Sequence, residues 1–148
     1  MKRALSYWEE QHYYKNNDIA IIGCGIVGLN AGIQLLNLDP SLRVIILERS
    51  GIPYGASTRN AGFACFGSPS ELMNDLKTFH ANEVFSLFKE RYTGIQELKN
   101  RLSNYDFEYE PKGGLEVFSP SRSIESSEIA ILNRHIEDYI GIKDYFIF

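Results

Sequence analysis

The chain has 148 residues, of which 44% are hydrophobic and 23% charged, and its formal net charge is -4. These fractions are typical of a globular domain and argue against a disordered, collagen-like or coiled-coil chain. The weak negative charge offers no basic surface, so a nucleic-acid partner is not expected. Apolar runs extend over only a few residues, far short of the ~20 that cross a bilayer, so we expect no transmembrane segment.

The first 17 residues are polar and aromatic, and Leu5, Trp8 and His12 at helical spacing predict a short leading helix. No apolar signal sequence is recognisable there. The two cysteines, Cys24 and Cys65, are too few for a disulfide framework and lack partners at metal-ligand spacing. We therefore expect free thiols, no metal site and a cytoplasmic protein, with peripheral membrane association left open.

Residues 19–48 predict a βαβ unit. The runs 19–22 and 43–48 are short, apolar and rich in β-branched residues, which is typical of strands buried on both faces. Between them, apolar residues recur at helical spacing up to Leu38, and Pro40 disfavours a helix beyond that point. A strand, glycine turn, helix and strand over about 30 residues form a right-handed parallel crossover.

The turn after the first strand has the spacing of a dinucleotide-binding fingerprint. Gly23, Gly25 and Gly28 form Gly-x-Gly-x-x-Gly, and Glu48 ends the second strand 20 residues after Gly28. The first glycine permits a tight turn, the second lets a pyrophosphate approach the backbone, and the third lets the helix pack on the strand. The helix start, with Ile26 and Val27, attracts phosphate.

Glu48 can accept hydrogen bonds from an adenosine ribose, and its charge disfavours a 2′-phosphate. The fingerprint serves NAD and FAD alike, and a plain βαβ unit without a ligand is the alternative. The loop over residues 55–62 favours FAD. Ser57 and Thr58 can bond phosphate or ribityl oxygens, Arg59 can offset charge, and Asn60 can bond the edge of a flavin. A solvated glycine loop is the other interpretation.

The rest of the chain reads as mainly helical. Ser68 or Ser70 is suited to cap a helix, and Gly141 to end one. The expected elements are a long amphipathic helix over 84–102, a second helix over 121–139, a hairpin-like pair of strands at 106–110 and 115–118, and a buried strand cut short at 145–148.

Residues 18–67 resemble the FAD-dependent oxidoreductases of the D-amino-acid oxidase type, a group that includes glycine oxidase and sarcosine oxidase. The resemblance rests on the glycine fingerprint, on Val-Ile-Ile-Leu-Glu-Arg at 44–49 and on Gly-Ala-Ser-Thr-Arg-Asn-Ala-Gly-Phe at 55–63. It implies a Rossmann-like α/β fold, FAD as cofactor, and oxidation of a C–N bond of a small amino acid or amine by hydride transfer to the flavin; the catalytic residues stay unknown. It implies FAD contacts from Gly23, Gly25, Ile26, Val27 and Gly28 at the pyrophosphate, from Glu48 and Arg49 at the adenosine, and from Ser57, Thr58, Asn60, Ala61 and Gly62 along the pyrophosphate, ribityl chain and flavin.

The same resemblance implies a longer fold, in which later strands complete the FAD domain. We expect residues 1–17 to be an extension, 18–70 the N-terminal part of the FAD-binding domain, and 71–148 a helical segment leading into an α+β substrate domain. The chain then reads as an N-terminal fragment whose partner is the remainder of the same enzyme. The alternatives are a catalytically inactive fragment with at most weak nucleotide binding, and an NAD-dependent dehydrogenase domain, which the 57–62 sequence disfavours.

Overall fold

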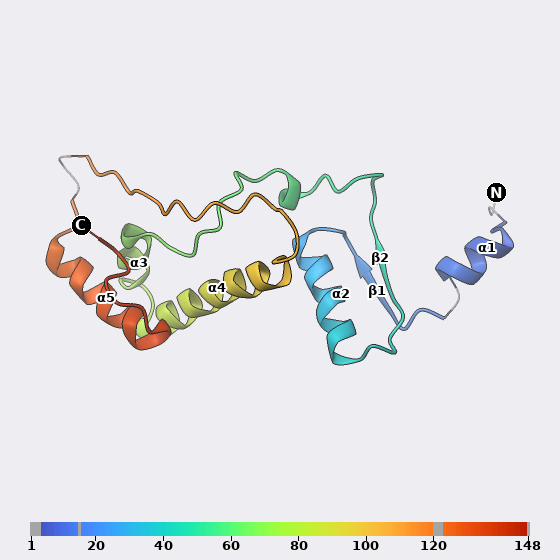
Figure 1. The fold of residues 1–148 in the computed structure, drawn as a ribbon, viewed down its shortest axis with the longest axis horizontal. Coiled ribbons are helices and arrows are strands. Elements are labelled where there is room, and N and C mark those ends of the chain that lie inside the picture. The colour runs from blue at the N-terminus through green and yellow to red at the C-terminus, as the bar shows by residue number, and fades with distance from the viewer. Residues whose placement is uncertain (1–3, 15, 120–122, 148) are drawn as a thin grey trace. The chain divides into compact units, whose positions relative to one another are not determined.

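The computed structural model describes residues 4–14, 16–119 and 123–147 (Figure 1). Two compact units divide the chain, Met1–Phe63 and Ala64–Phe148, and each is described by itself. No helix within the described ranges is both long and apolar enough to cross a membrane.

The first unit begins with helix α1 (Tyr7–Glu9), which continues into a π-helical turn, η1 (Glu10–Tyr14). A capping box starts α1: the Ser6 hydroxyl accepts from the Glu9 N–H, and the Glu9 carboxylate accepts from the Ser6 N–H. The rings of Trp8 and His12 stack with their centroids 5.7 Å apart. The predicted leading helix is therefore confirmed, although its second half is wound more loosely than an α-helix.

A βαβ crossover forms the body of this unit. Strands β1 (Ile19–Ile22) and β2 (Val44–Leu47) pair in parallel, with Ile19 opposite Val44, and helix α2 (Ile26–Leu38) connects them. The helix lies close to both strands at Gly32, where an added Cβ would stand 3.3 Å from a methyl group of Ile46. The predicted βαβ unit with parallel strands is confirmed.

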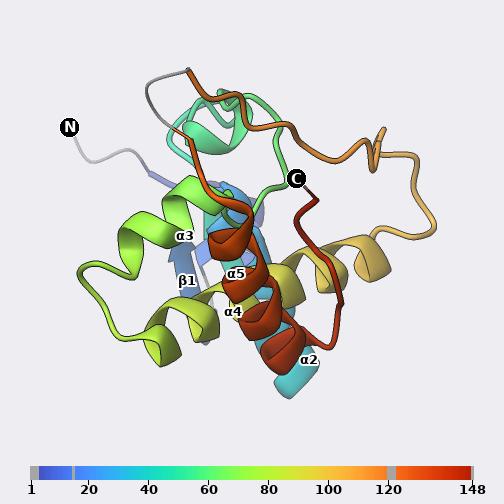
Figure 2. The same cartoon turned by 90° about the vertical axis from the view of Figure 1, so that its left-hand side faces the viewer.

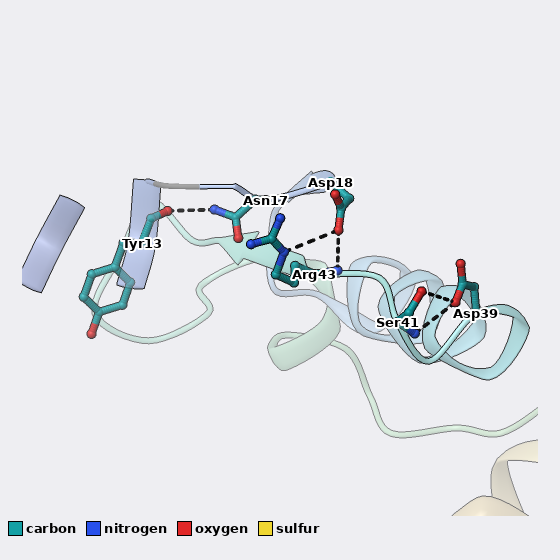
Figure 3. Close-up of polar contacts among 6 residues, drawn as sticks. All are labelled: Tyr13, Asn17, Asp18, Asp39, Ser41 and Arg43. Carbon is teal, nitrogen blue, oxygen red and sulfur yellow. Dashed lines mark hydrogen bonds and ion pairs between the residues drawn. The ribbon is translucent and has the colours of Figure 1, made fainter. Parts of the chain in front are cut away.

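Polar contacts close the amino end of this small sheet. The Asp18 carboxylate accepts from the Arg43 N–H at 2.8 Å and forms an ion pair with the Arg43 guanidinium (Figure 3). Beyond α2, the Asp39 carboxylate accepts from the N–H and the hydroxyl of Ser41, and the hydroxyl contact is the main reason that the pKa of Asp39 lies below its usual value (Figure 3). These contacts set the turn that brings the chain back to β2.

The prediction that both strands are buried on two faces is wrong. Exposed and half-buried residues alternate along β1, and Ile22 is 89% exposed. The reason is that α2 packs against one face of the sheet, while the described residues of the unit provide no second layer for the other face.

The second unit is a helical cluster. It contains α3 (Pro69–Asp75), α4 (Ala81–Arg101) and α5 (Ser126–Ile140), and α5 packs against α3 and α4 (Figure 2). Apolar side chains at helical spacing meet in its core, which consists of Leu72, Val84, Phe85, Phe88, Leu132 and Ile136. The helices predicted over 84–102 and 121–139 are confirmed with shifted bounds, although residues 121 and 122 lie outside the described ranges.

Local signals set where these helices begin and end. The Ser68 hydroxyl accepts from the Glu71 N–H at the start of α3, which confirms one of the two predicted caps. At the starts of α4 and α5, the carboxylates of Glu83 and Glu128 accept from backbone N–H groups three residues earlier. Gly141 ends α5 with a φ of 75°, as expected for a left-handed C-terminal position.

The predicted hairpin is wrong, because residues 106–110 and 115–118 form no strand in the structure. Two isolated strands are only marginally stable without a third strand or a covering helix. The second segment is instead held by Glu116, whose carboxylate accepts from the Ser68 hydroxyl at 3.2 Å and from the Ser70 N–H at 3.1 Å. Its neighbours Leu115 and Val117 are 98% and 90% exposed.

The strand predicted over residues 145–148 is likewise wrong for 145–147, and residue 148 lies outside the described ranges. Asn133 on α5 takes the place of a strand partner. Its side-chain amide donates to the Phe146 carbonyl at 2.9 Å, and its side-chain oxygen accepts from the Phe146 N–H at 2.8 Å. One side chain therefore satisfies both backbone polar groups of Phe146.

We expect Asn133→Ala to lower the free energy of unfolding by about 2 kcal/mol, because it leaves the partly buried N–H and carbonyl of Phe146 without hydrogen-bond partners. Urea unfolding followed by circular dichroism measures this. Asn100→Ala, which removes an exposed amide from α4, is the matched control and should leave the midpoint nearly unchanged. Equal midpoints for the two variants would contradict the bracing role of Asn133.

Candidate functional site

A cavity of about 360 Å³ lies at the carboxyl ends of β1 and β2. In open α/β sheets, ligands bind at this edge. The glycine turn, the end of β2 and the following loop line the cavity, with contributions from Ile22, Gly23, Gly25, residues 47–50, residues 53–55 and Ser57. All of these residues belong to the first unit.

The structure brings together five of the residues that the sequence analysis assigned to the site: Gly23, Gly25, Glu48, Arg49 and Ser57. Ile26, Val27 and Gly28 follow the glycine turn as the first residues of α2. Thr58, Asn60, Ala61 and Gly62 do not line the cavity. Sequence reasoning missed Tyr54 and Pro53, for which an aromatic residue beside a proline in a glycine-rich loop was the available signal.

Each glycine of the fingerprint has its own structural reason. Gly23 has a φ of 99°, a conformation that other residues rarely adopt, and its N–H donates to the Leu47 carbonyl at 2.8 Å. A side chain on Gly28 would collide with the carbonyl oxygen of Gly23, so only glycine lets α2 start this close to the turn. Gly25 caps α2 in an extended conformation, and an added Cβ would stand 3.0 Å from the Ser57 hydroxyl oxygen.

Glu48 binds the glycine turn directly. Its carboxylate accepts from the Cys24 N–H at 3.0 Å and from the Ser50 N–H at 3.2 Å. Hydrogen bonds to the charged form lower the pKa of Glu48, and the bond from Cys24 is the largest cause. The carboxylate therefore stays ionised and links the end of β2 to the turn that follows β1.

Ser57 reaches the start of α2 from the loop. Its hydroxyl oxygen accepts from the Ile26 N–H at 2.9 Å, across 31 positions of sequence. The first amides of an α-helix have no acceptor within the helix, so this oxygen satisfies one of them. The amides of Val27 and Gly28, next along the helix, point the same way and are suited to an anion.

Thr58 and Asn60 stabilise the loop itself. The Thr58 hydroxyl donates to the Pro53 carbonyl at 2.7 Å. The Asn60 side chain donates to the Ser57 carbonyl at 3.0 Å and accepts from the Gly62 N–H at 2.7 Å. These bonds give a defined shape to the loop around the short helix η2 (Ala56–Thr58). Nearby, the Arg59 guanidinium stacks on the Tyr54 ring with 5.2 Å to its centroid.

Other features of the described residues do not form a comparable site. The structure contains no cluster of three or more His, Cys, Asp or Glu side chains within those ranges that could hold a metal ion. Cys24 is half-buried and Cys65 exposed, both as free thiols. A larger depression of about 490 Å³ runs along α4 beside Tyr139, but its walls are polar and charged surface residues such as Lys89 and Glu90 and carry no sequence motif.

The chain belongs to the DAO family, described as FAD dependent oxidoreductase, whose model matches residues 18–141. The family is FAD dependent, which agrees with the cofactor inferred from the sequence. The chain thus resembles FAD-dependent oxidoreductases, and the resemblance identified from residues 18–67 is confirmed.

Three curated proteins are similar to the chain in sequence. The chain is 24% identical over 126 residues to the Probable oxidoreductase OrdL of Haemophilus influenzae, which covers 85% of the chain and 26% of that protein. It is 26% identical over 113 residues to the Gamma-glutamylputrescine oxidoreductase of Escherichia coli, covering 75% of the chain and 26% of that protein. A shorter match, 46% identical over 46 residues, covers 30% of the chain and 10% of the mitochondrial L-2-hydroxyglutarate dehydrogenase of Dictyostelium discoideum.

The chain therefore spans about a quarter of the length of the first two of these relatives. No solved structure matches the sequence significantly.

Proposed function

We propose that the chain binds FAD in the cavity at the carboxyl ends of β1 and β2. We further propose that it supplies this part of the cofactor site to an enzyme that oxidises a C–N bond of an amino acid or amine. The observation that carries the proposal is the cavity itself, which is lined by Gly23 and Gly25 of the fingerprint together with Glu48 and Ser57. Family membership supports FAD as the ligand.

The residues present fit a dinucleotide. Gly25 faces the cavity without a side chain, and the amides of Val27 and Gly28 in the first turn of α2 are suited to a pyrophosphate. The ionised Glu48 carboxylate would accept from the ribose hydroxyls, with Arg49 beside the adenosine. Thr58, Asn60, Ala61 and Gly62 would act through the shape of the loop and its backbone, because the polar side chains of Thr58 and Asn60 are engaged with that loop.

When bound at these residues, FAD would supply the redox chemistry, as the acceptor for a hydride from the substrate carbon. The choice of an amine or amino acid as substrate draws on the relative from Escherichia coli, whose name specifies gamma-glutamylputrescine. We assign no catalytic residue to this chain. A cytoplasmic location and the division at residues 17 and 70 stay predictions from the sequence.

Titration of the chain with FAD, ADP and NAD, followed by fluorescence and calorimetry, tests the cofactor. We expect FAD to bind saturably and ADP to compete with it, because the cavity is built for the adenosine and pyrophosphate half. Tighter binding of NAD than of FAD would support the dehydrogenase alternative. Failure to bind any of the three nucleotides would contradict the proposal and support the alternative of an inactive fragment.

Glu48→Ala should weaken FAD binding roughly tenfold, because the variant loses the charged acceptor for the ribose hydroxyls. Calorimetry with FAD measures the change. Glu90→Ala removes an exposed carboxylate from α4 in the second unit and provides the matched control. Equal FAD affinity for wild type and Glu48→Ala would show that the Glu48 carboxylate does not contribute to FAD binding.

A further inference from the structure

We propose that Ser57 is a positioning residue of the FAD site. Its hydroxyl, seated in the space left by the missing side chain of Gly25, holds the 55–62 loop against the glycine turn before the cofactor arrives. The inference rests on the proposed function and adds to it a physical link between the two sequence segments that form the site. It also gives Gly25 a second reason to be glycine.

The link is a single well-formed hydrogen bond. The Ile26 N–H donates to the Ser57 oxygen at 2.9 Å, in the range of good N–H···O geometry. Because Ile26 is the first residue of α2, its amide has no acceptor inside the helix, and Ser57 acts as a cap supplied from another segment. The short helix η2 carries Ser57, and the bonds of Thr58 and Asn60 brace it on the loop side.

Gly25 makes room for this contact. Its φ of -82° and ψ of 177° are ordinary extended values, so its backbone conformation does not require glycine. An added Cβ would stand 3.0 Å from the Ser57 oxygen but 3.9 Å from the Ser57 Cβ. The oxygen would have to shift away from the new methyl group, and such a shift disturbs its bond to Ile26. The structure therefore couples the two positions, because a methyl group at residue 25 crowds the hydroxyl at residue 57.

This coupling matters for the cofactor because Gly25 and Ser57 both line the cavity. A ligand that spans two loosely joined segments must order them when it binds, and that ordering weakens its apparent affinity. With Ser57 bonded to Ile26, the two segments are already aligned. Loss of the bond should therefore affect FAD binding even though neither chain segment unfolds.

A double-mutant cycle of Gly25→Ala and Ser57→Ala tests the coupling in the chain without FAD. Hydrogen exchange of the Ile26 amide, measured by NMR, reports the bond. Each single variant should exchange roughly fivefold faster, as for loss of an N-terminal cap, and the double variant should exchange no faster than the singles. If the Ile26 amide of the double variant instead exchanges faster than in wild type by the product of the two single-variant accelerations, the inference is overturned.

Further measurements distinguish a role of Ser57 in positioning the loop from a role in stabilising α2 as a whole. The Leu29 N–H, which donates to the Gly25 carbonyl at 2.9 Å, should stay protected throughout. Loss of its protection would mean that Ser57 stabilises α2 as a whole, and would overturn the inference. Ser57→Thr retains a hydroxyl at the same position and should restore slow exchange at Ile26, whereas Ser103→Ala, on the second unit, should change nothing.

Calorimetry with FAD completes the test. Ser57→Ala should bind FAD roughly fivefold more weakly than wild type, and Ser57→Thr should recover most of the loss. Unchanged FAD affinity in Ser57→Ala, with wild type still binding, would overturn the positioning role and leave the proposed function intact. No FAD binding by the wild-type chain would overturn the proposed function and this inference with it.

Discussion

Gly28→Ala should abolish measurable FAD binding and lower the free energy of unfolding of the first unit by about 3 kcal/mol. The added methyl group would collide with the carbonyl oxygen of Gly23, and its next neighbours are the carbonyl carbon of Gly23 and a methyl group of Ile21 at 3.3 Å. Two of these atoms are backbone, so they cannot rotate away as a flexible side chain could. Overpacking of this kind typically costs 1–3 kcal/mol.

The same collision explains why FAD binding should fail as well. Relief of the collision requires α2 to move away from the glycine turn, and the shape of that turn, which lines the cavity with Gly23 and Gly25, would then be lost. Denaturant unfolding and calorimetry with FAD measure the two effects. Gly94→Ala, at an open position within α4, is the matched glycine control and should stabilise the second unit by about 1 kcal/mol. A Gly28→Ala chain that unfolds and binds FAD like wild type would contradict the close approach seen here.

Leu132→Ala should destabilise the second unit by about 3–5 kcal/mol, which is enough to unfold a marginally stable helical cluster. The Leu132 side chain is fully buried among the apolar residues of α3, α4 and α5, so its truncation removes buried surface and leaves a cavity. Thermal unfolding followed by circular dichroism measures the loss. The cavity at the carboxyl ends of β1 and β2 belongs to the first unit, so the measurement concerns folding alone.

The adjacent residue offers a close control. Ile131 lies on the same helix but is 52% exposed, and Ile131→Ala should change the free energy of unfolding by less than 1 kcal/mol. Similar losses for the two variants would show that the core of this unit is not where the structure places it.

The parts of the fold that followed from the sequence are those that local patterns determine. The crossover of β1, α2 and β2 is specified by apolar runs, a glycine turn and Pro40 within a 30-residue stretch. The hairpin prediction failed because alternation indicates only that a segment can be extended. Whether it pairs depends on a partner strand, and the Glu116 contacts with Ser68 and Ser70 are made with residues more than 40 positions away.

The same distinction holds for the site. The fingerprint spacing identified the glycines and Glu48 as residues that meet at one edge of the sheet. It could not show that Glu48 accepts from the Cys24 N–H or that Ser57 accepts from the Ile26 N–H, because those bonds depend on the path of the chain between segments. The sequence analysis also treated Thr58 and Asn60 as ligand contacts on the strength of their polar groups, although hydrogen-bonding groups serve loop geometry equally well.

The contacts of Asp18 with Arg43 lie at the end of the small sheet opposite the cavity. They join the strands at the amino end, while the cavity occupies the carboxyl end. The strands between them hold four residues each, so about 10 Å of β-structure separates the two ends. A fluorophore or affinity handle attached near Ser41, in the turn beside Arg43, would therefore lie on the side of the unit away from the cavity, and the two ends can be engineered independently.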